Sequence, residues 1–209
     1  MTYKERSLVN ILRKPPKAAP SLPAVELHGP RLVVRPPRAG DAEDWAATRN
    51  RNRAFLTPFE PLWPDEDLTA AHFTQRLARQ AADWRLGRGQ PFLVFLHDGA
   101  LAGGININNI ARGAAQYASL GYWLDEARQG QGLMLEALNL IIAYGFEEVR
   151  LHRFNAGCLT HNTRSHNLLF RCGFRVEGMA EKYLEINGEW RDHVLFGLPV
   201  ERWLAERSA

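Results

Sequence analysis

Cysteine is scarce in this sequence. The chain has 209 residues and only two cysteines, Cys158 and Cys172. So few cysteines in a chain of this length exclude a disulfide framework, and we expect both thiols to be reduced and close to the core. A metal centre needs more cysteine, histidine or carboxylate ligands at close spacing than the sequence offers, so no metal is expected.

The sequence also has no long apolar run and no strong excess of one charge. No segment reaches the length of a membrane span, and the first ten residues are polar and charged, unlike a secretory signal. The 26 basic and 23 acidic residues give a net charge of +3, too balanced for a nucleic-acid-binding protein but comfortable for a small anionic cofactor. We therefore expect a cytoplasmic protein without direct membrane or nucleic-acid partners.

Hydrophobic residues make up 45% of the chain, which is ordinary for one globular domain with a substantial core. Residues 1–24 contain Pro15, Pro16, Pro20 and Pro23 and are predicted to be an N-terminal extension. The domain is predicted to span residues 25–209. The periodicity of apolar residues and the turn signals predict helices starting near residue 42 and over 69–86, 133–146 and 165–171, and strands over 31–35, 91–97, 101–110, 117–124, 153–159, 174–176, 183–186 and 190–198. Residues 56–64 are expected to form an irregular loop.

The most informative segment is a glycine turn, Gln129–Gly130–Gln131–Gly132–Leu133–Met134, between a strand and a long apolar helix. A turn at a helix N-terminus presents free backbone N–H groups and the positive end of the helix dipole, so it suits a phosphate or pyrophosphate. The segment lacks the third glycine of a dinucleotide-binding fingerprint and the Gly-Lys-Ser/Thr of a nucleotide-triphosphate loop. Both of those common explanations are therefore excluded.

The turn resembles the pyrophosphate loop Q/R-x-x-G-x-G/A of the Gcn5-related N-acetyltransferase (GNAT) superfamily. Met134 departs from the small residue at the last place, but backbone N–H groups can still bind the pyrophosphate. The resemblance implies the GNAT fold, an α/β (α+β) architecture with a mixed, mostly antiparallel sheet, splayed central strands and helices on both faces. It also implies acetyl-CoA as cofactor, with its pyrophosphate on Gln129–Met134 and its pantetheine arm along Tyr122, Trp123 and Leu124 and against Asn162.

Further segments resemble the RimJ/RimL branch of this superfamily, which acetylates protein N-termini. These are Gly121-Tyr122-Trp123-Leu124-Asp125-Glu126 and, as in the RimJ type, residues 31–35, 55–61 and 177–193. The resemblance implies an enzyme that transfers acetyl from acetyl-CoA to the N-terminal α-amino group of an Ala- or Ser-starting protein, ribosomal by analogy. The amine would attack the thioester directly in a ternary complex.

The same resemblance and the residue chemistry suggest catalytic and acceptor-binding residues. Ser165, in the N-x-x-S position, is predicted to be the proton donor to the leaving CoA thiolate; the alternative is that Ser165 only caps its helix. The glutamate that some relatives carry is replaced here by Leu184. Glu60 is predicted as the general base because it lies in the aromatic loop that resembles the acceptor-binding region; proton loss through water is the alternative. Other candidate bases are Asp192, His193 and His161. Aromatic side chains are expected to wall the acceptor pocket, namely Phe55, Phe59, Trp63 and Tyr183.

Two alternative functions stay open at this point. One is a GNAT enzyme that acetylates a small-molecule amine such as an amino acid, a polyamine or an antibiotic. The other is a ribosome-associated module that binds acetyl-CoA without turnover, which the basic residues near the N-terminus would suit. The sequence fits a monomer or a homodimer.

Overall fold

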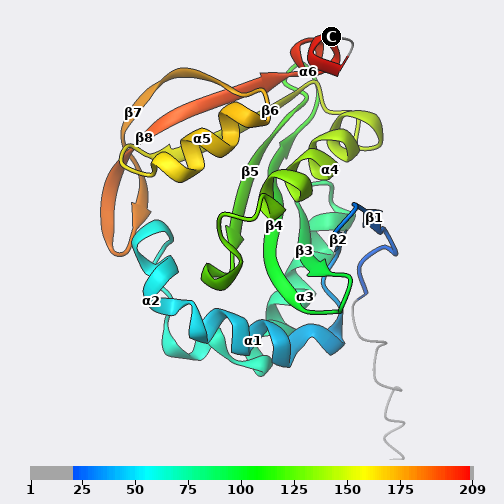
Figure 1. Cartoon of the computed structure of the whole chain (residues 1–209), viewed down its shortest axis with the longest axis vertical. Helices are drawn as coiled ribbons and strands as arrows, with labels where there is room; N and C mark the ends of the chain where they lie inside the picture. Colours follow the sequence, from blue (N-terminus) through cyan, green and yellow to red (C-terminus); the bar gives the residue numbers. More distant parts are fainter. Residues whose placement is uncertain (1–20, 208–209) are drawn as a thin grey trace, which may run out of the picture.

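The computed structural model describes residues 21–207, so residues 1–20 of the predicted extension lie outside the described residues. Eight strands form one sheet in the order β1-β2-β3-β4-β5-β6-β8-β7 (Figure 1). The strands are β1 Leu27–His28, β2 Leu32–Arg35, β3 Gln90–Leu96, β4 Leu101–Ala111, β5 Tyr117–Leu124, β6 Arg153–Leu159, β7 Arg175–Ile186 and β8 Glu189–Pro199. The helices are α1 Ala42–Arg51, α2 Arg53–Leu56, α3 Ala70–Arg85, α4 Leu133–Glu147, α5 Thr163–Arg171 and α6 Val200–Arg207.

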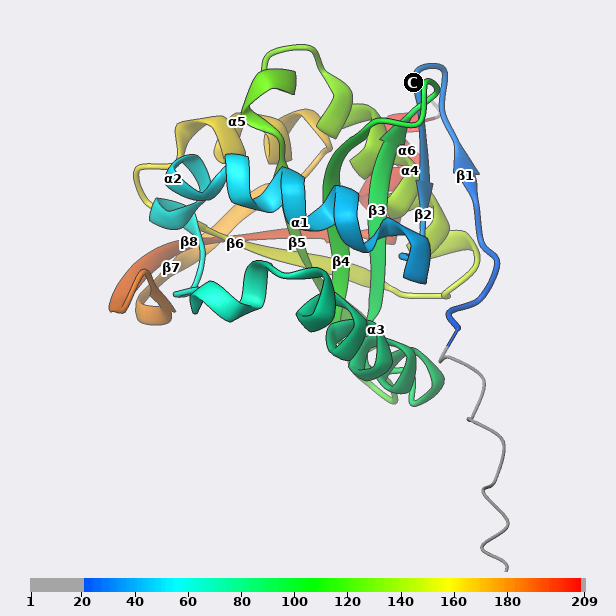
Figure 2. The same ribbon diagram turned by 90° about the horizontal axis from the view of Figure 1, so that it is seen from below.

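Helices cover both faces of the sheet, as Figure 2 shows. Successive side chains of a strand point to opposite faces. Phe92 and Val94 of β3 accordingly belong to the main core, which they share with α4. Leu93 and Phe95, the residues after each of them, belong to a second apolar cluster with α1 and α3. The predicted mixed sheet with helices on both faces is therefore confirmed.

One pair of neighbouring strands separates. All neighbouring strands are antiparallel except β5 and β6, which run parallel and pair only over Tyr117–Ser119 and Arg153–Asn155. Beyond this short ladder β5 continues to Leu124 and β6 to Leu159 without pairing to each other. The splayed central strands that the sequence predicted are therefore β5 and β6. Their separation leaves one backbone edge of β5 open beyond Ser119.

Several local predictions are confirmed. Both cysteines are free and buried. The predicted helix over 69–86 is α3; its N-cap is Thr69, whose Oγ1 accepts the backbone N–H of His72 at 3.1 Å. The turn between β7 and β8 has positive φ at both Asn187 and Gly188, as expected of an Asn-Gly hairpin.

Among residues 21–207, no helix combines the length and apolar character that a membrane span requires.

Other local predictions were wrong. The segments 174–176 and 183–186 are two ends of one strand, β7, whose middle is exposed at the sheet edge and interrupted by register shifts, so it carries no apolar pattern. The predicted loop 56–64 begins with the end of α2 and a 3-10 turn, Thr57–Phe59. Helix α6 was not predicted, because Trp203 is its only buried residue and one anchor gives no periodicity.

Candidate active site

A cavity of about 1090 Å³ opens where β5 and β6 separate. It is bounded by these strands, the N-terminus of α4, helix α5 and the segment from α1 to α3. Most residues predicted for the site line this cavity: Phe55, Phe59, Glu60, Tyr122, Trp123, Leu124, Gln129, Gly130, Gly132, Leu133, Met134, Asn162 and Ser165. Gln131 and Tyr183 are not among its lining residues.

The glycine turn has the geometry of an anion site. Gly130 and Gly132 have φ values of 72° and 73°, a left-handed conformation that other residues adopt only with strain. Gly132 is the N-cap of α4 and no side chain caps this end. The first turn of the helix therefore keeps free N–H groups that face the cavity. Arg31, just before β2, holds the turn, because its Nη1 donates to the Gln131 carbonyl at 2.7 Å and its Nε to Glu136 at 2.7 Å.

Basic side chains add charge beside this turn. Arg164 of α5 donates from Nη1 to the Gln129 side-chain oxygen at 3.0 Å, so it joins α5 to the turn across the cavity mouth. Arg171, about two turns further along α5, lines the same cavity. A diphosphate placed at the turn would lie within a positive environment made by backbone N–H groups and guanidinium groups.

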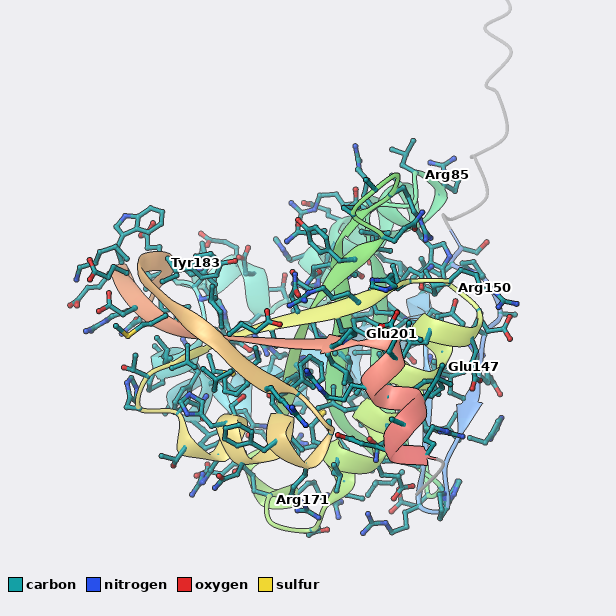
Figure 3. All side chains as sticks on the ribbon, turned by 90° about the horizontal axis from the view of Figure 1, so that it is seen from above. Arg85, Glu147, Arg150, Arg171, Tyr183 and Glu201 are labelled. Atoms are coloured by element: carbon teal, nitrogen blue, oxygen red, sulfur yellow. The ribbon has the colours of Figure 1, made fainter. Side chains whose placement is uncertain are left out.

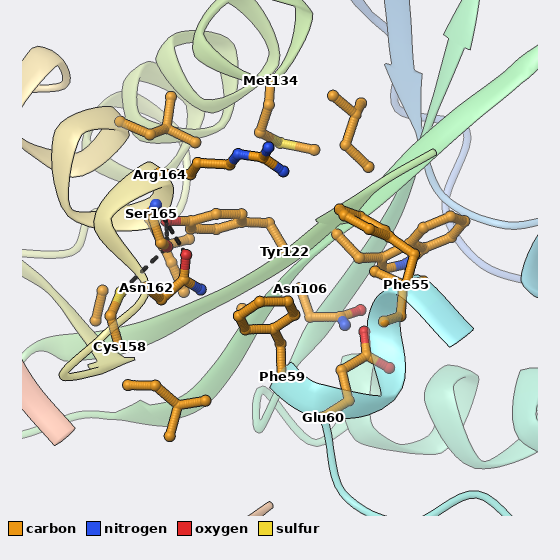
Figure 4. Close-up of a pocket in the computed structure, with 18 of the residues that line it drawn as sticks. Phe55, Phe59, Glu60, Asn106, Tyr122, Met134, Cys158, Asn162, Arg164 and Ser165 are labelled. Carbon is orange, nitrogen blue, oxygen red and sulfur yellow. Dashed lines mark hydrogen bonds between the residues drawn. The ribbon is translucent and has the colours of Figure 1, made fainter. Parts of the chain in front are cut away.

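Three side chains meet around Ser165 (Figure 4). The Tyr122 hydroxyl lies 2.5 Å from Ser165 Oγ, and the Cys158 thiol donates to the same oxygen at 3.2 Å. Burial raises the pKa of both the Tyr122 phenol and the Cys158 thiol, so all three groups stay protonated. The helix cap is Asn162, whose Oδ1 accepts the Ser165 N–H at 3.2 Å. The alternative that Ser165 caps α5 was therefore wrong, and its hydroxyl is held in the cavity instead.

The other end of the cavity is aromatic and charged, and Figure 4 shows Phe55 and Glu60 there, away from Ser165. Glu60 is engaged by Arg49 of α1, whose two terminal nitrogens donate to its carboxylate oxygens at 3.1 and 2.5 Å. The Arg49 guanidinium also lies between two indole rings, 3.6 Å from the centroid of Trp63 and 4.8 Å from that of Trp123. Both carboxylate oxygens of Glu60 are therefore occupied by hydrogen bonds from Arg49.

The remaining predicted bases differ in position. His193 is 2% exposed, lines the cavity and donates from Nδ1 to the Arg191 carbonyl at 2.9 Å, so its Nε2 is the basic atom of the neutral ring. Asp192 points away and accepts the Lys182 N–H. His161 is exposed and packs on Phe59. Tyr183 stacks edge-on against His193, on the protruding β7–β8 hairpin (Figure 3).

Comparison with known proteins places this geometry in a family. A model of the acetyltransferase (GNAT) domain matches residues 31–175. The chain belongs to the GNAT acetyltransferase family. It is 37% identical over 188 residues to the ribosomal protein uS5-alanine N-acetyltransferase of Escherichia coli, and this alignment covers 90% of the chain and 97% of that protein.

Solved structures of GNAT proteins agree with the fold. RimJ of Mycobacterium smegmatis, in complex with CoA-disulfide, superposes with a TM-score of 0.79 at 33% identity, over 84% of this chain and 89% of that one. The ribosomal-protein-S5-alanine acetyltransferase of Vibrio fischeri gives a TM-score of 0.80 at 32% identity, over 86% and 98%. The expected GNAT fold and acetyl-CoA-dependent N-acetyltransferase activity are confirmed.

Sequence reasoning missed several side chains of this GNAT site. The contribution of Tyr122 was expected from its backbone alone, yet its hydroxyl is hydrogen-bonded to Ser165. Cys158 was expected only as a core thiol, and it also donates to Ser165. Arg49 carried no signal at all, since a basic residue late in a helix is usually a solvated one. Tyr122 and Ser165 are 43 residues apart in the sequence, and only the fold brings their side chains together.

Proposed function

We propose that this enzyme acetylates the N-terminal α-amino group of a protein that begins with Ala or Ser, and that its acceptor is a ribosomal protein. The similarity to a relative with a named acceptor supports this acceptor class. That relative, from Escherichia coli, is an alanine N-acetyltransferase of ribosomal protein uS5, and the chain matches nearly the whole length of that protein. The observation that carries the chemistry is the cavity that joins the glycine turn, the open edge of β5 and Ser165 to an aromatic acceptor end.

In this proposal acetyl-CoA enters the cleft between β5 and β6. Its pyrophosphate lies on Gln129–Met134, and its pantetheine arm adds to the open backbone edge at Tyr122–Leu124 and meets Asn162. The side-chain oxygen of Asn162 is already used as the cap of α5, so its amide nitrogen is the group that faces the cofactor. This arrangement would bring the thioester toward the Ser165 end of the cavity.

The acceptor amine must lose a proton before or as it attacks. An unperturbed α-amino group has a pKa of about 8, so only modest assistance is needed. We assign this role to Nε2 of His193, directly or through water, because Nδ1 donates to the Arg191 carbonyl and Nε2 is the nitrogen left to accept a proton. Glu60 as the base stays a prediction, and its pairing with Arg49 argues against it.

The second proton moves to the leaving group. Collapse of the tetrahedral intermediate releases the CoA thiolate, which takes a proton from Ser165 Oγ, while the Tyr122 hydroxyl keeps its own proton and holds Ser165 at 2.5 Å. Ser165 then recovers a proton from solvent, and the proton taken from the amine returns to solvent. The predicted wall of Phe55 and Phe59, whose ring centroids are 6.4 Å apart, suits a small acceptor residue next to the amine.

The test measures CoA release from acetyl-CoA with peptides that begin with Ala or Ser, against a panel of small amines. The proposal expects peptide turnover to exceed that of every small amine; the reverse order would assign the enzyme to small-molecule acetylation. Ser165→Ala is expected to lower kcat about 100-fold with little change in KM for acetyl-CoA. Thr163→Ala, an exposed hydroxyl on the same helix, is the matched control, and equal kcat in both variants would remove Ser165 from the mechanism.

A further inference from the structure

The acceptor end of the cavity holds two arginines, and only one has a partner. Arg49 is paired with Glu60 and stacked on two tryptophans. Arg76 of α3 lines the same cavity. Among residues 21–207 Arg76 makes no hydrogen bond and no ion pair, and its nearest aromatic contact is Trp45, 5.8 Å from the guanidinium carbon to the ring centroid.

The nearby carboxylates are committed elsewhere. Both oxygens of Glu60 accept from Arg49, and Asp67 lies 3.0 Å from Nδ1 of His72. Burial lowers the pKa of Arg76, the positive charge of Arg49 lowers it further, and the charges of Glu60 and Asp67 oppose this only in part. A half-buried guanidinium is thus held in the cavity wall without a hydrogen-bonded counterion, so its N–H donors stay available to an anionic ligand in the cavity.

We propose that Arg76 binds a carboxylate of the acceptor, carried by an acidic side chain close behind the residue that is acetylated. This inference rests on the proposed N-terminal acetylation. A guanidinium offers two parallel N–H donors that match a carboxylate, which makes it suited to this recognition. Arg49 lies in the same wall and adds positive charge, so a basic side chain at the same place is disfavoured.

The place of the acid along the acceptor follows from chain geometry. An extended peptide advances about 3.3 Å per residue, so side chains at positions two to four lie within about 3 to 10 Å of the reacting amine along the chain. Arg76 comes from α3, whereas Ser165 comes from α5, so we expect Arg76 to meet residues that follow the first one. The subsite therefore selects among acceptors that all begin with Ala or Ser.

The experiment compares matched Ala-starting peptides that carry Glu or Gln at position two, three or four and are otherwise identical. The expected result is that Glu raises kcat/KM at least about tenfold at one of these positions, the size of a hydrogen bond to a charged group. In Arg76→Gln the Glu and Gln peptides are expected to react at the same rate. Arg76→Lys keeps the positive charge but lacks the two parallel N–H donors of the guanidinium, so it should retain part of the preference for Glu.

Arg85→Gln is the matched control. Arg85 is an exposed arginine at the end of the same helix, away from the cavity (Figure 3), and its replacement should leave the preference for Glu unchanged. Equal rates for every Glu and Gln pair with the unaltered enzyme, or a preference that survives Arg76→Gln, would overturn the inference. Those results differ from failure of the proposed function, in which no peptide is acetylated. If Arg76→Gln does not fold, the peptide series on the unaltered enzyme and on Arg76→Lys still decides.

Discussion

The pair formed by Arg49 and Glu60 allows a quantitative prediction. The two side chains are only 8% and 20% exposed, two hydrogen bonds join them, and Nε of Arg49 is buried without a partner. Arg49→Met keeps most of the volume between Trp63 and Trp123 but removes the charge. The carboxylate of Glu60 is then left with no cation hydrogen-bonded to it in the wall of the acceptor end.

Removal of one partner from a buried ion pair costs about 3–5 kcal/mol, because the other charge stays buried and uncompensated. We expect the lower value, about 3 kcal/mol, since Glu60 borders the cavity and keeps access to water. For a protein of this size about 1 kcal/mol corresponds to about 2–4 °C, so Tm should fall by about 6–12 °C. The KM for peptides should rise as well, because the Glu60 carbonyl also accepts the Asn187 N–H of the β7–β8 hairpin at 2.9 Å.

Thermal and urea unfolding of Arg49→Met, Glu60→Gln and the double variant measure the coupling. Each single change leaves one charge unpaired, so the double variant should be destabilised by clearly less than the sum. Arg88→Met is the control, because it breaks the Arg88–Asp83 pair, whose side chains are 62% and 45% exposed, and should cost less than about 1 kcal/mol. Additive effects, or an Arg49→Met cost as small as that of Arg88→Met, would refute the assignment of this pair to the packed acceptor wall.

Two further predictions concern the cofactor turn and the buried thiols. In Gly132→Ala the new Cβ meets only Arg31 Nη2, at 3.6 Å, but alanine is forced to a φ of 73°, which costs about 1–2 kcal/mol. Calorimetry should therefore show roughly tenfold weaker CoA binding. The control is Gly113→Ala, with a φ of 69° in a distant turn, which should leave CoA affinity unchanged. Burial raises the pKa of Cys172 from 9.0 to about 12, so its stabilising effect is present below pH 9 and is lost as pH rises toward 12. Tm measured from pH 8 to 11 should fall less steeply in Cys172→Ala, and an unchanged slope would contradict this.

The cofactor half of the site was readable from the sequence for a physical reason. Its proposed contacts to acetyl-CoA come largely from backbone groups, and the backbone conformation that such groups need is visible in the local sequence. Gly130 and Gly132 are glycines because their φ values are positive, and Asn162 is an asparagine because it caps α5. Each of these requirements acts within a few residues, so a short motif records it. The same holds for the Asn187–Gly188 turn and for the cap at Thr69.

The rest of the site depends on side chains that meet only after folding. Ser165 was recognised by its position in a motif, but its hydrogen bonds to Tyr122 and Cys158 join three elements that no spacing rule connects. Glu60 was expected as a base because an acidic residue among aromatics looks functional. The structure gives it a partner from another helix, Arg49, and so changes its expected role.

This contrast bears on how the acceptor is chosen. In the proposed arrangement acetyl-CoA is bound mainly by backbone groups, so cofactor binding can be kept while the side chains of the acceptor end change. The acceptor end is built by side chains from α1, from the segment before α3, and from α3 and β8, among them Arg49, Glu60, Arg76 and His193. A single substitution among them alters charge or shape next to the acceptor without touching the glycine turn. Acceptor specificity should therefore follow these side chains, and the exchange of Arg76 tests that directly.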